Sequence, residues 1–102
     1  MAAVRYDSFS QFYPYYLAQH EHRLCRRAHF LGTSSAVAGI AQFVASQNPL
    51  WLLLAVVTGY GGAWIGHFAF EKNRPATFDY PWYSFRADWV MYWAMLTGKL
   101  SW

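Results

Sequence analysis

A histidine and a glutamate stand four residues apart in GHFAFEKNRPATFDYP, the stretch from Gly66 to Pro81. On a helix, His67 and Glu71 would share one face. The stretch follows a long uncharged run and opens a second cluster of charges. An imidazole and a carboxylate on one face can hold a metal ion or move a proton. The sequence therefore predicts a reactive site at this end of the uncharged run.

The other histidines come earlier in the chain, in HEHRLCRRAH. His22 and His29 are seven residues apart and would share a face of one helix. His20 lies nine residues before His29, so both can reach one metal ion only if the chain bends near residues 20–22. We therefore predict that one helix ends near His20 and that the next carries His29. The single cysteine, Cys25, excludes an internal disulfide and a metal site built from several cysteines.

The window from Ala28 to Phe70 contains no Asp, Glu, Lys or Arg. It divides into two apolar segments, 29–46 and 50–70, separated by the turn signal SQNP. Each segment has close to the ~20 residues that cross a bilayer, and both are rich in small residues that allow close helix packing. We predict an antiparallel transmembrane hairpin, with a buried hairpin of a soluble protein as the alternative.

The hairpin predicts where its histidines lie. His29 comes nineteen residues before Asn48, and His67 comes nineteen after it. At ~1.5 Å rise per residue, both should lie about 28 Å from the turn, at the same depth. Basic residues flank the open end, whereas the turn has none, so the positive-inside tendency places both termini and the site on the cytoplasmic side of an integral membrane protein.

The composition favours the same fold class. Hydrophobic residues make up 56% of the chain and charged residues only 13%, too few for a soluble domain of this size. The net charge of +3 without a basic block argues against nucleic-acid binding. We expect an all-α, membrane-embedded helical bundle in which interfacial amphipathic helices flank the hairpin. It would form a single domain over residues 1–102, with helices near 8–20, 22–46, 50–72 and 82–98.

The histidines and the carboxylate leave several chemistries open. Such ligands suit Fe(II), zinc or manganese, and the spacing does not choose among them. Non-haem iron would activate O₂, zinc with a bound water would hydrolyse, and paired histidines can hold a haem. Three basic residues at the same end could receive the carboxylate of a fatty acid or contact lipid head groups; they are Arg26, Lys72 and Arg74.

Two blocks of the chain resemble the 2-hydroxy fatty acid dioxygenases, small membrane proteins formerly catalogued as a domain of unknown function. The blocks are FYPYYLAQHEHRLCRRAHFLGT and GHFAFEKNRPATFDYPWYSFRADWVMYWAMLTGKL, and GHxxFEKNRPA is the more specific motif. The resemblance implies an Fe(II) site built on histidines. It implies α-oxidation of a long-chain 2-hydroxy fatty acid by O₂, which shortens the acid by one carbon.

The resemblance also implies roles for particular residues. Carried over position by position, it makes His20, His29 and His67 iron ligands and Glu71 a catalytic residue. His22 becomes a further ligand or a supporting partner. Membrane lipid is an expected partner, and the composition suits a homodimer.

The chain departs from the family where Arg23 and Cys25 stand in place of a common proline and asparagine. The alternative function is a non-enzymatic membrane protein. Its histidines would then hold a haem or a structural metal, or simply pair with Glu71 and Asp88.

Overall fold

The computed structural model describes residues 6–102, and within them every regular element is a helix. The expected all-α class is confirmed, and residues 1–5 of the expected domain lie outside the described residues. A π-helix over Gly66–Glu71 continues directly from the α-helix Leu50–Ile65, so the helix expected over 50–72 is divided into two parts. The elements are α1 (Phe9–Ala18), α2 (Arg23–Ser46), α3 (Leu50–Ile65), η1 (Gly66–Glu71), the 3₁₀ turn η2 (Ala76–Phe78) and α4 (Pro81–Leu96).

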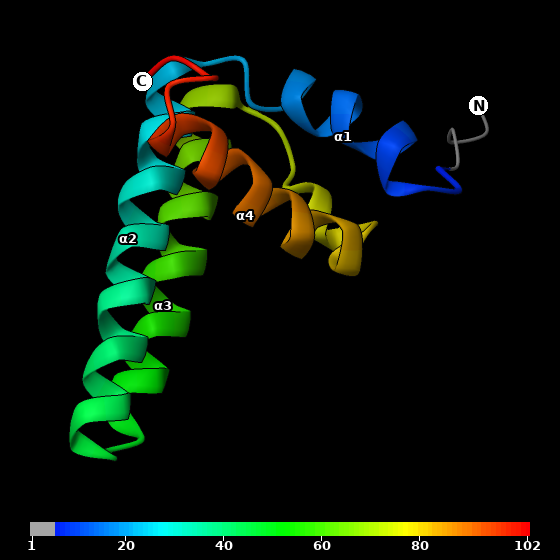
Figure 1. Ribbon diagram of the computed structural model, residues 1–102. Helices are drawn as coiled ribbons and strands as arrows, with labels where there is room; N and C mark the ends of the chain where they lie inside the picture. The colour runs from blue at the N-terminus through cyan, green and yellow to red at the C-terminus, as the bar shows by residue number, and fades with distance from the viewer. Residues whose placement is uncertain (1–5) are drawn as a thin grey trace.

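Helices α2 and α3 lie side by side and antiparallel (Figure 1). Gln47 ends α2 in the left-handed conformation, with φ 59°, and its N–H donates to Phe43 O at 2.7 Å. The side chain of Asn48 then accepts the N–H of Leu50 at 3.1 Å, which helps to start α3. The turn expected from SQNP therefore rests on local hydrogen bonds.

Glycines let the two helices of the hairpin touch through their backbones. A Cβ built on Gly62 would lie 2.6 Å from Ala28 O and 2.9 Å from Gly32 Cα. A Cβ on Gly39 would lie 3.0 Å from Trp51 O. By contrast, a Cβ on Gly61 would meet nothing within 4 Å. The hairpin interface therefore requires glycine at particular positions.

We expect Gly62→Ala to destabilise the protein and Gly61→Ala to stabilise it. The new methyl group at residue 62 must push α2 and α3 apart, and overpacking of this kind costs about 1–3 kcal/mol. At residue 61 the methyl group enters open space, and replacing a helical glycine by alanine gains about 0.5–1 kcal/mol. Chemical unfolding in detergent measures both. Equal effects of the two substitutions would contradict the close contact at Gly62.

Helix α4 packs against the hairpin near its open end, α1 packs against α4 and extends away from the hairpin, and the half of the hairpin near the turn projects away from both (Figure 1). Ser8 caps α1 by accepting the Gln11 N–H at 3.2 Å, and Pro81 starts α4. The buried core lies between these two helices. Its members are Phe12, Tyr16, Ala76, Ala87, Met91 and Met95.

One helix of the described chain is long and apolar enough to cross a membrane, Leu50–Glu71, which combines α3 and η1. Helix α2 does not meet the same criterion, because its small and polar residues dilute its hydropathy. The second span of the expected transmembrane hairpin therefore stays a prediction. Much apolar surface is nevertheless exposed, including Leu53 and Val57 on α3 and Trp82 and Trp93 on α4.

Candidate metal centre

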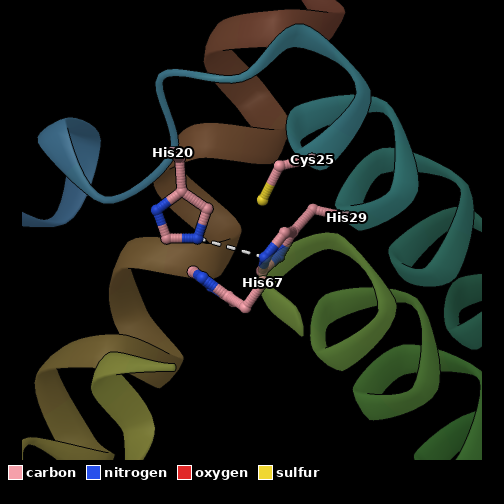
Figure 2. Close-up of side chains that lie close together, drawn as sticks. All are labelled: His20, Cys25, His29 and His67. Carbon is pink, nitrogen blue, oxygen red and sulfur yellow. Dashed lines mark hydrogen bonds between the residues drawn. The ribbon is translucent and has the colours of Figure 1, made fainter. Parts of the chain in front are cut away.

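Three histidine rings from three separate segments meet at the open end of the hairpin (Figure 2). His20 comes from the connection between α1 and α2, His29 from α2, and His67 from η1. Their ring centroids lie 4.4 to 5.1 Å apart, and the residues are only 1%, 5% and 2% exposed. With Cys25, each offers one potential ligand atom, and these atoms all lie within 4.8 Å of one another.

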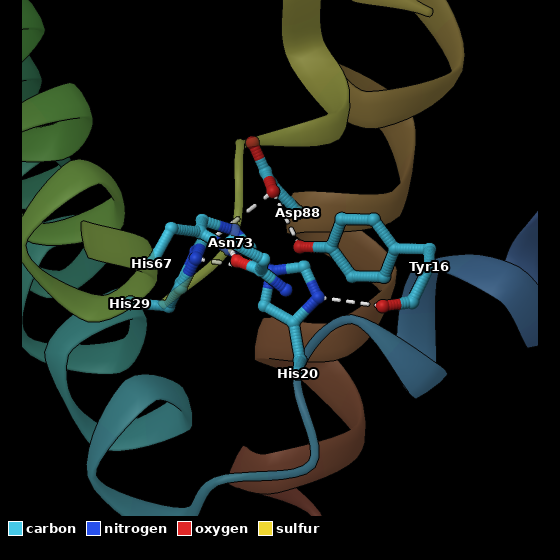
Figure 3. Close-up of polar contacts among 6 residues, drawn as sticks. All are labelled: Tyr16, His20, His29, His67, Asn73 and Asp88. Carbon is cyan, nitrogen blue, oxygen red and sulfur yellow. Dashed lines mark hydrogen bonds and ion pairs between the residues drawn. The ribbon is translucent and has the colours of Figure 1, made fainter. Parts of the chain in front are cut away.

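Each ring also has an oxygen beside its Nδ1 atom (Figure 3). His20 Nδ1 donates to Tyr16 O at 2.6 Å, and His67 Nδ1 lies 2.7 Å from Asn73 Oδ1. His29 Nδ1 lies 3.9 Å from Asp88 Oδ1. Oxygen partners of this kind orient metal-binding histidines and set their tautomer. The Nε2 atoms of His20 and His67 are thereby left for a ligand, whereas the 3.9 Å between His29 Nδ1 and Asp88 is too long for a hydrogen bond and does not set the tautomer of His29.

The Nε2 atoms of His20 and His29 face each other at 3.1 Å. Because Tyr16 O can only accept a hydrogen bond, a neutral His20 carries its proton on Nδ1 and presents a lone pair from Nε2. That lone pair requires a proton or a cation opposite it. Imidazole nitrogens and a thiol suit borderline metals such as Fe(II) and zinc, so the residues present fit a metal ion.

Burial sets the protonation state of the site. Desolvation, aided by the nearby charge of His67 when protonated, lowers the pKa of His20 to about 3. The ring is therefore neutral near pH 7, which is the form that binds metals. Desolvation also disfavours the charged form of Asp88, and it therefore raises the pKa of this carboxyl group to about 7. A hydrogen bond from the Tyr16 hydroxyl opposes this shift.

A break between α1 and α2 brings His20 back towards His29. Helix α1 ends at Ala18, and α2 begins only at Arg23, so the bend expected near residues 20–22 is present. Arg26, expected at the substrate, donates from its NH1 atom to His20 O at 3.1 Å and to Glu21 O at 2.8 Å. The structure thus places Arg26 as an anchor of the bend.

The π-helix and the residue after it position His67. Lys72, expected at the substrate, ends η1 in the left-handed conformation with φ 58°, and its side chain is exposed. The chain then turns back, so that the Asn73 N–H donates to His67 O at 3.1 Å. The Asn73 amide group also donates to Gln19 O at 3.2 Å and to Gln19 Oε1 at 3.0 Å. Asn73 therefore ties the His67 segment to the bend that carries His20.

His22 and Glu71 lie outside the group of converging ligand atoms. His22 is exposed and caps α2, accepting the Leu24 N–H on Nδ1 at 3.1 Å. Glu71 accepts the backbone N–H of His22. The expected shared face of His67 and Glu71 therefore does not bring the carboxylate into the ligand group, because His22, 49 residues away along the chain, takes it as a partner.

Arg74 also lies away from the histidines. It forms an exposed ion pair with Asp79, with 3.7 Å between its NH2 atom and Oδ1, and its guanidinium lies 4.9 Å from the ring centre of Phe78. These contacts are those of a surface residue. Because water screens the charges, an exposed ion pair of this kind contributes little to the stability of the fold.

Sequence reasoning missed Cys25 and Asn73 as members of the site. Cys25 lies four residues before His29 on α2, so helical spacing could have placed both on one face. Desolvation, together with the charge of Glu71, raises the pKa of Cys25 to about 12, so without a metal ion the residue is a thiol. The only sequence signal for Asn73 is its place in the GHxxFEKNRPA motif. Helical spacing could not place it beside His67, because that contact depends on the left-handed turn at Lys72.

One of the comparisons with known proteins finds a family for the chain. The family model for 2-hydroxy-palmitic acid dioxygenase Mpo1-like proteins matches residues 6–100, nearly the whole chain. No curated protein and no solved structure matches the chain significantly. Because this match covers far more than half of the chain, the chain belongs to the 2-hydroxy-palmitic acid dioxygenase Mpo1-like family.

Proposed function

We propose that the protein is an Fe(II)-dependent dioxygenase that converts a long-chain 2-hydroxy fatty acid and O₂ into the acid one carbon shorter, with the carboxyl carbon released as CO₂ and one water formed. The observation that carries this proposal is the convergence of three buried histidines whose Nδ1 atoms each face an oxygen, in a chain of this family. When bound, Fe(II) with open coordination positions supplies chelation of the 2-hydroxy acid and activation of O₂.

The protein's own residues bind the metal ion and orient the histidine rings that hold it. His20, His29 and His67 hold the metal through Nε2. Tyr16 O and Asn73 Oδ1 keep two of the rings in the tautomer that leaves Nε2 free. Burial of all three rings keeps bulk water from the reacting atoms.

Four further residues support the site from its edge. Arg26 holds the bend at His20, and Glu71 holds the same segment through the His22 N–H. Lys72 and Arg74 are exposed cations near the end of η1, and they attract the carboxylate of the acid or anionic lipid head groups.

The protein acts at a membrane in this proposal. The apolar Leu50–Glu71 helix embeds in the bilayer, and the basic residues around the open end keep the metal centre at the cytoplasmic surface. The exposed aromatic face of α4 suits the membrane interface. A homodimer in the membrane remains an expectation from the apolar surface.

The test supplies 2-hydroxyhexadecanoic acid and O₂ to protein purified without oxygen and loaded with Fe(II). We expect pentadecanoic acid to form with consumption of O₂. Hexadecanoic acid is the control and should not react, because it lacks the hydroxyl group needed for chelation. Lack of product from the hydroxy acid, or product formed equally well without O₂, would contradict the proposal.

A structural metal site is the second candidate, and Cys25 is the observation that favours it. Three histidines and a cysteine within 4.8 Å offer four ligands, the number that closes a tetrahedral structural zinc site. Near-stoichiometric zinc that stabilises the fold and supports no reaction with O₂ would decide for this alternative.

A further inference from the structure

An apolar groove of about 340 Å³ runs along the hairpin from His29 of the metal centre. His29 and Asp88 line one end, whereas Ile40 and Leu52 line the other. We infer that this groove binds the alkyl chain of the fatty acid whose head is held at the metal centre. The inference rests on the proposed function, because it assumes an acid at that site.

The groove has the length of a long alkyl chain. His29 and Ile40 are eleven residues apart on α2, which corresponds to about 16 Å along the helix. Leu52 lies near Ile40 because the neighbouring Gly39 contacts the backbone of Trp51 and Ala55. A groove of about 16 Å accommodates roughly a dozen extended methylene groups.

The polar groups of the groove determine which way the acid lies. Among residues 6–102 no lysine or arginine lines it, and its charged or metal-binding side chains, His29 and Asp88, stand at one end. The remaining lining is apolar apart from Thr33 and Tyr60. A carboxylate therefore has a partner only at the metal end, and the alkyl chain must point towards the turn of the hairpin.

The helices around the groove also separate a closed part from an open part. Phe85 and Trp89 of α4 line the groove together with His29 and Asp88, and α4 crosses the hairpin only near its open end (Figure 1). Towards the turn the groove is bounded by α2 and α3, whose outer side chains are exposed. An acid can therefore enter sideways from the bilayer and bring its head to the covered end.

The groove predicts how affinity depends on chain length. Burial of each methylene group should strengthen binding roughly fourfold. We expect affinity to rise from 2-hydroxyoctanoic acid to 2-hydroxytetradecanoic acid and then to level off, because further methylene groups extend past Ile40. Binding is measured without O₂ on the iron-loaded protein, so that no turnover occurs.

Ile40→Trp should shorten the groove, and Val37→Trp is its matched control. Both positions lie on α2 and are similarly exposed, at 42% and 41%, but Val37 does not line the groove. We expect Ile40→Trp to weaken binding of 2-hydroxyhexadecanoic acid at least tenfold and to leave 2-hydroxyoctanoic acid unaffected. Val56→Trp, another exposed lining position, should repeat the effect if Ile40→Trp fails to fold.

A photoreactive acid locates the end of the bound alkyl chain directly. A 2-hydroxy acid with a diazirine at its last carbon should crosslink to residues 36–40 and 52–56 of the wild-type protein, and excess unlabelled acid should prevent this. Crosslinks on the exposed face of α4 would overturn the inference. So would crosslinks that unlabelled acid does not reduce, because these indicate a groove filled by bilayer lipid.

The outcomes separate the groove from the proposed reaction. Chain-length-dependent binding that is lost in Ile40→Trp, without any turnover, would uphold the groove and refute the dioxygenase. Turnover with the same chain-length dependence in wild type, Ile40→Trp and Val37→Trp would refute the groove and uphold the dioxygenase.

Discussion

Protein carrying His67→Ala is expected to contain almost no iron after anaerobic purification, whereas wild-type protein contains it near-stoichiometrically. His67 contributes one of three buried rings whose centroids lie within 5.1 Å of one another. Loss of a group that merely orients a metal-binding histidine costs about 10–100-fold in affinity or activity. Removal of a ligand itself must cost more, and turnover of the 2-hydroxy acid should disappear together with the iron.

The control for this prediction is His22→Asn. His22 is exposed and caps α2, and asparagine is an equally good residue at a helix N-cap. Iron content and turnover should therefore match the wild type. Elemental analysis gives the metal content, and circular dichroism in detergent verifies that both variants remain helical. Iron retained in His67→Ala, or lost equally in both variants, would refute His67 as a ligand.

The second large effect is expected at Asn73, which acts through its contacts with His67 and Gln19. Asn73→Ala removes the oxygen 2.7 Å from His67 Nδ1 and the two hydrogen bonds to Gln19. The His67 ring can then rotate, and the bend that carries His20 loses its link to η1. We expect the affinity for the metal to fall about 10–100-fold.

Asn73→Asp separates the two roles of this side chain. Aspartate still offers an oxygen to His67 but cannot donate to Gln19, so most of the metal affinity should remain if the orientation of His67 dominates. Competition with a chelator for Co(II), followed by its absorption spectrum, measures affinity without any catalytic assay. Wild-type affinity in Asn73→Ala would show that other contacts set the orientation of the ring.

The sequence alone was sufficient to predict those features that follow from counting along a regular helix. The uncharged window and its central turn signal predict two helices joined by a tight turn, and these are present as α2 and α3. Equal distances from Asn48 predict that His29 and His67 lie at the same depth, and their ring centroids are 5.1 Å apart. The nine-residue spacing of His20 and His29 required a bend, which the structure has after Ala18.

Features that depend on an irregular backbone or on distant contacts were decided only by the tertiary structure. Glu71 at the end of the π-helix contacts the backbone of His22, at the start of α2, instead of joining the histidine group. The left-handed turn at Lys72 brings Asn73 to His67. The hairpin and α4 together place Asp88 beside His29 and form the apolar groove. Helical periodicity predicts which residues share a face only within one regular segment. These contacts lie between segments, where the close packing of the backbones determines which side chains face one another.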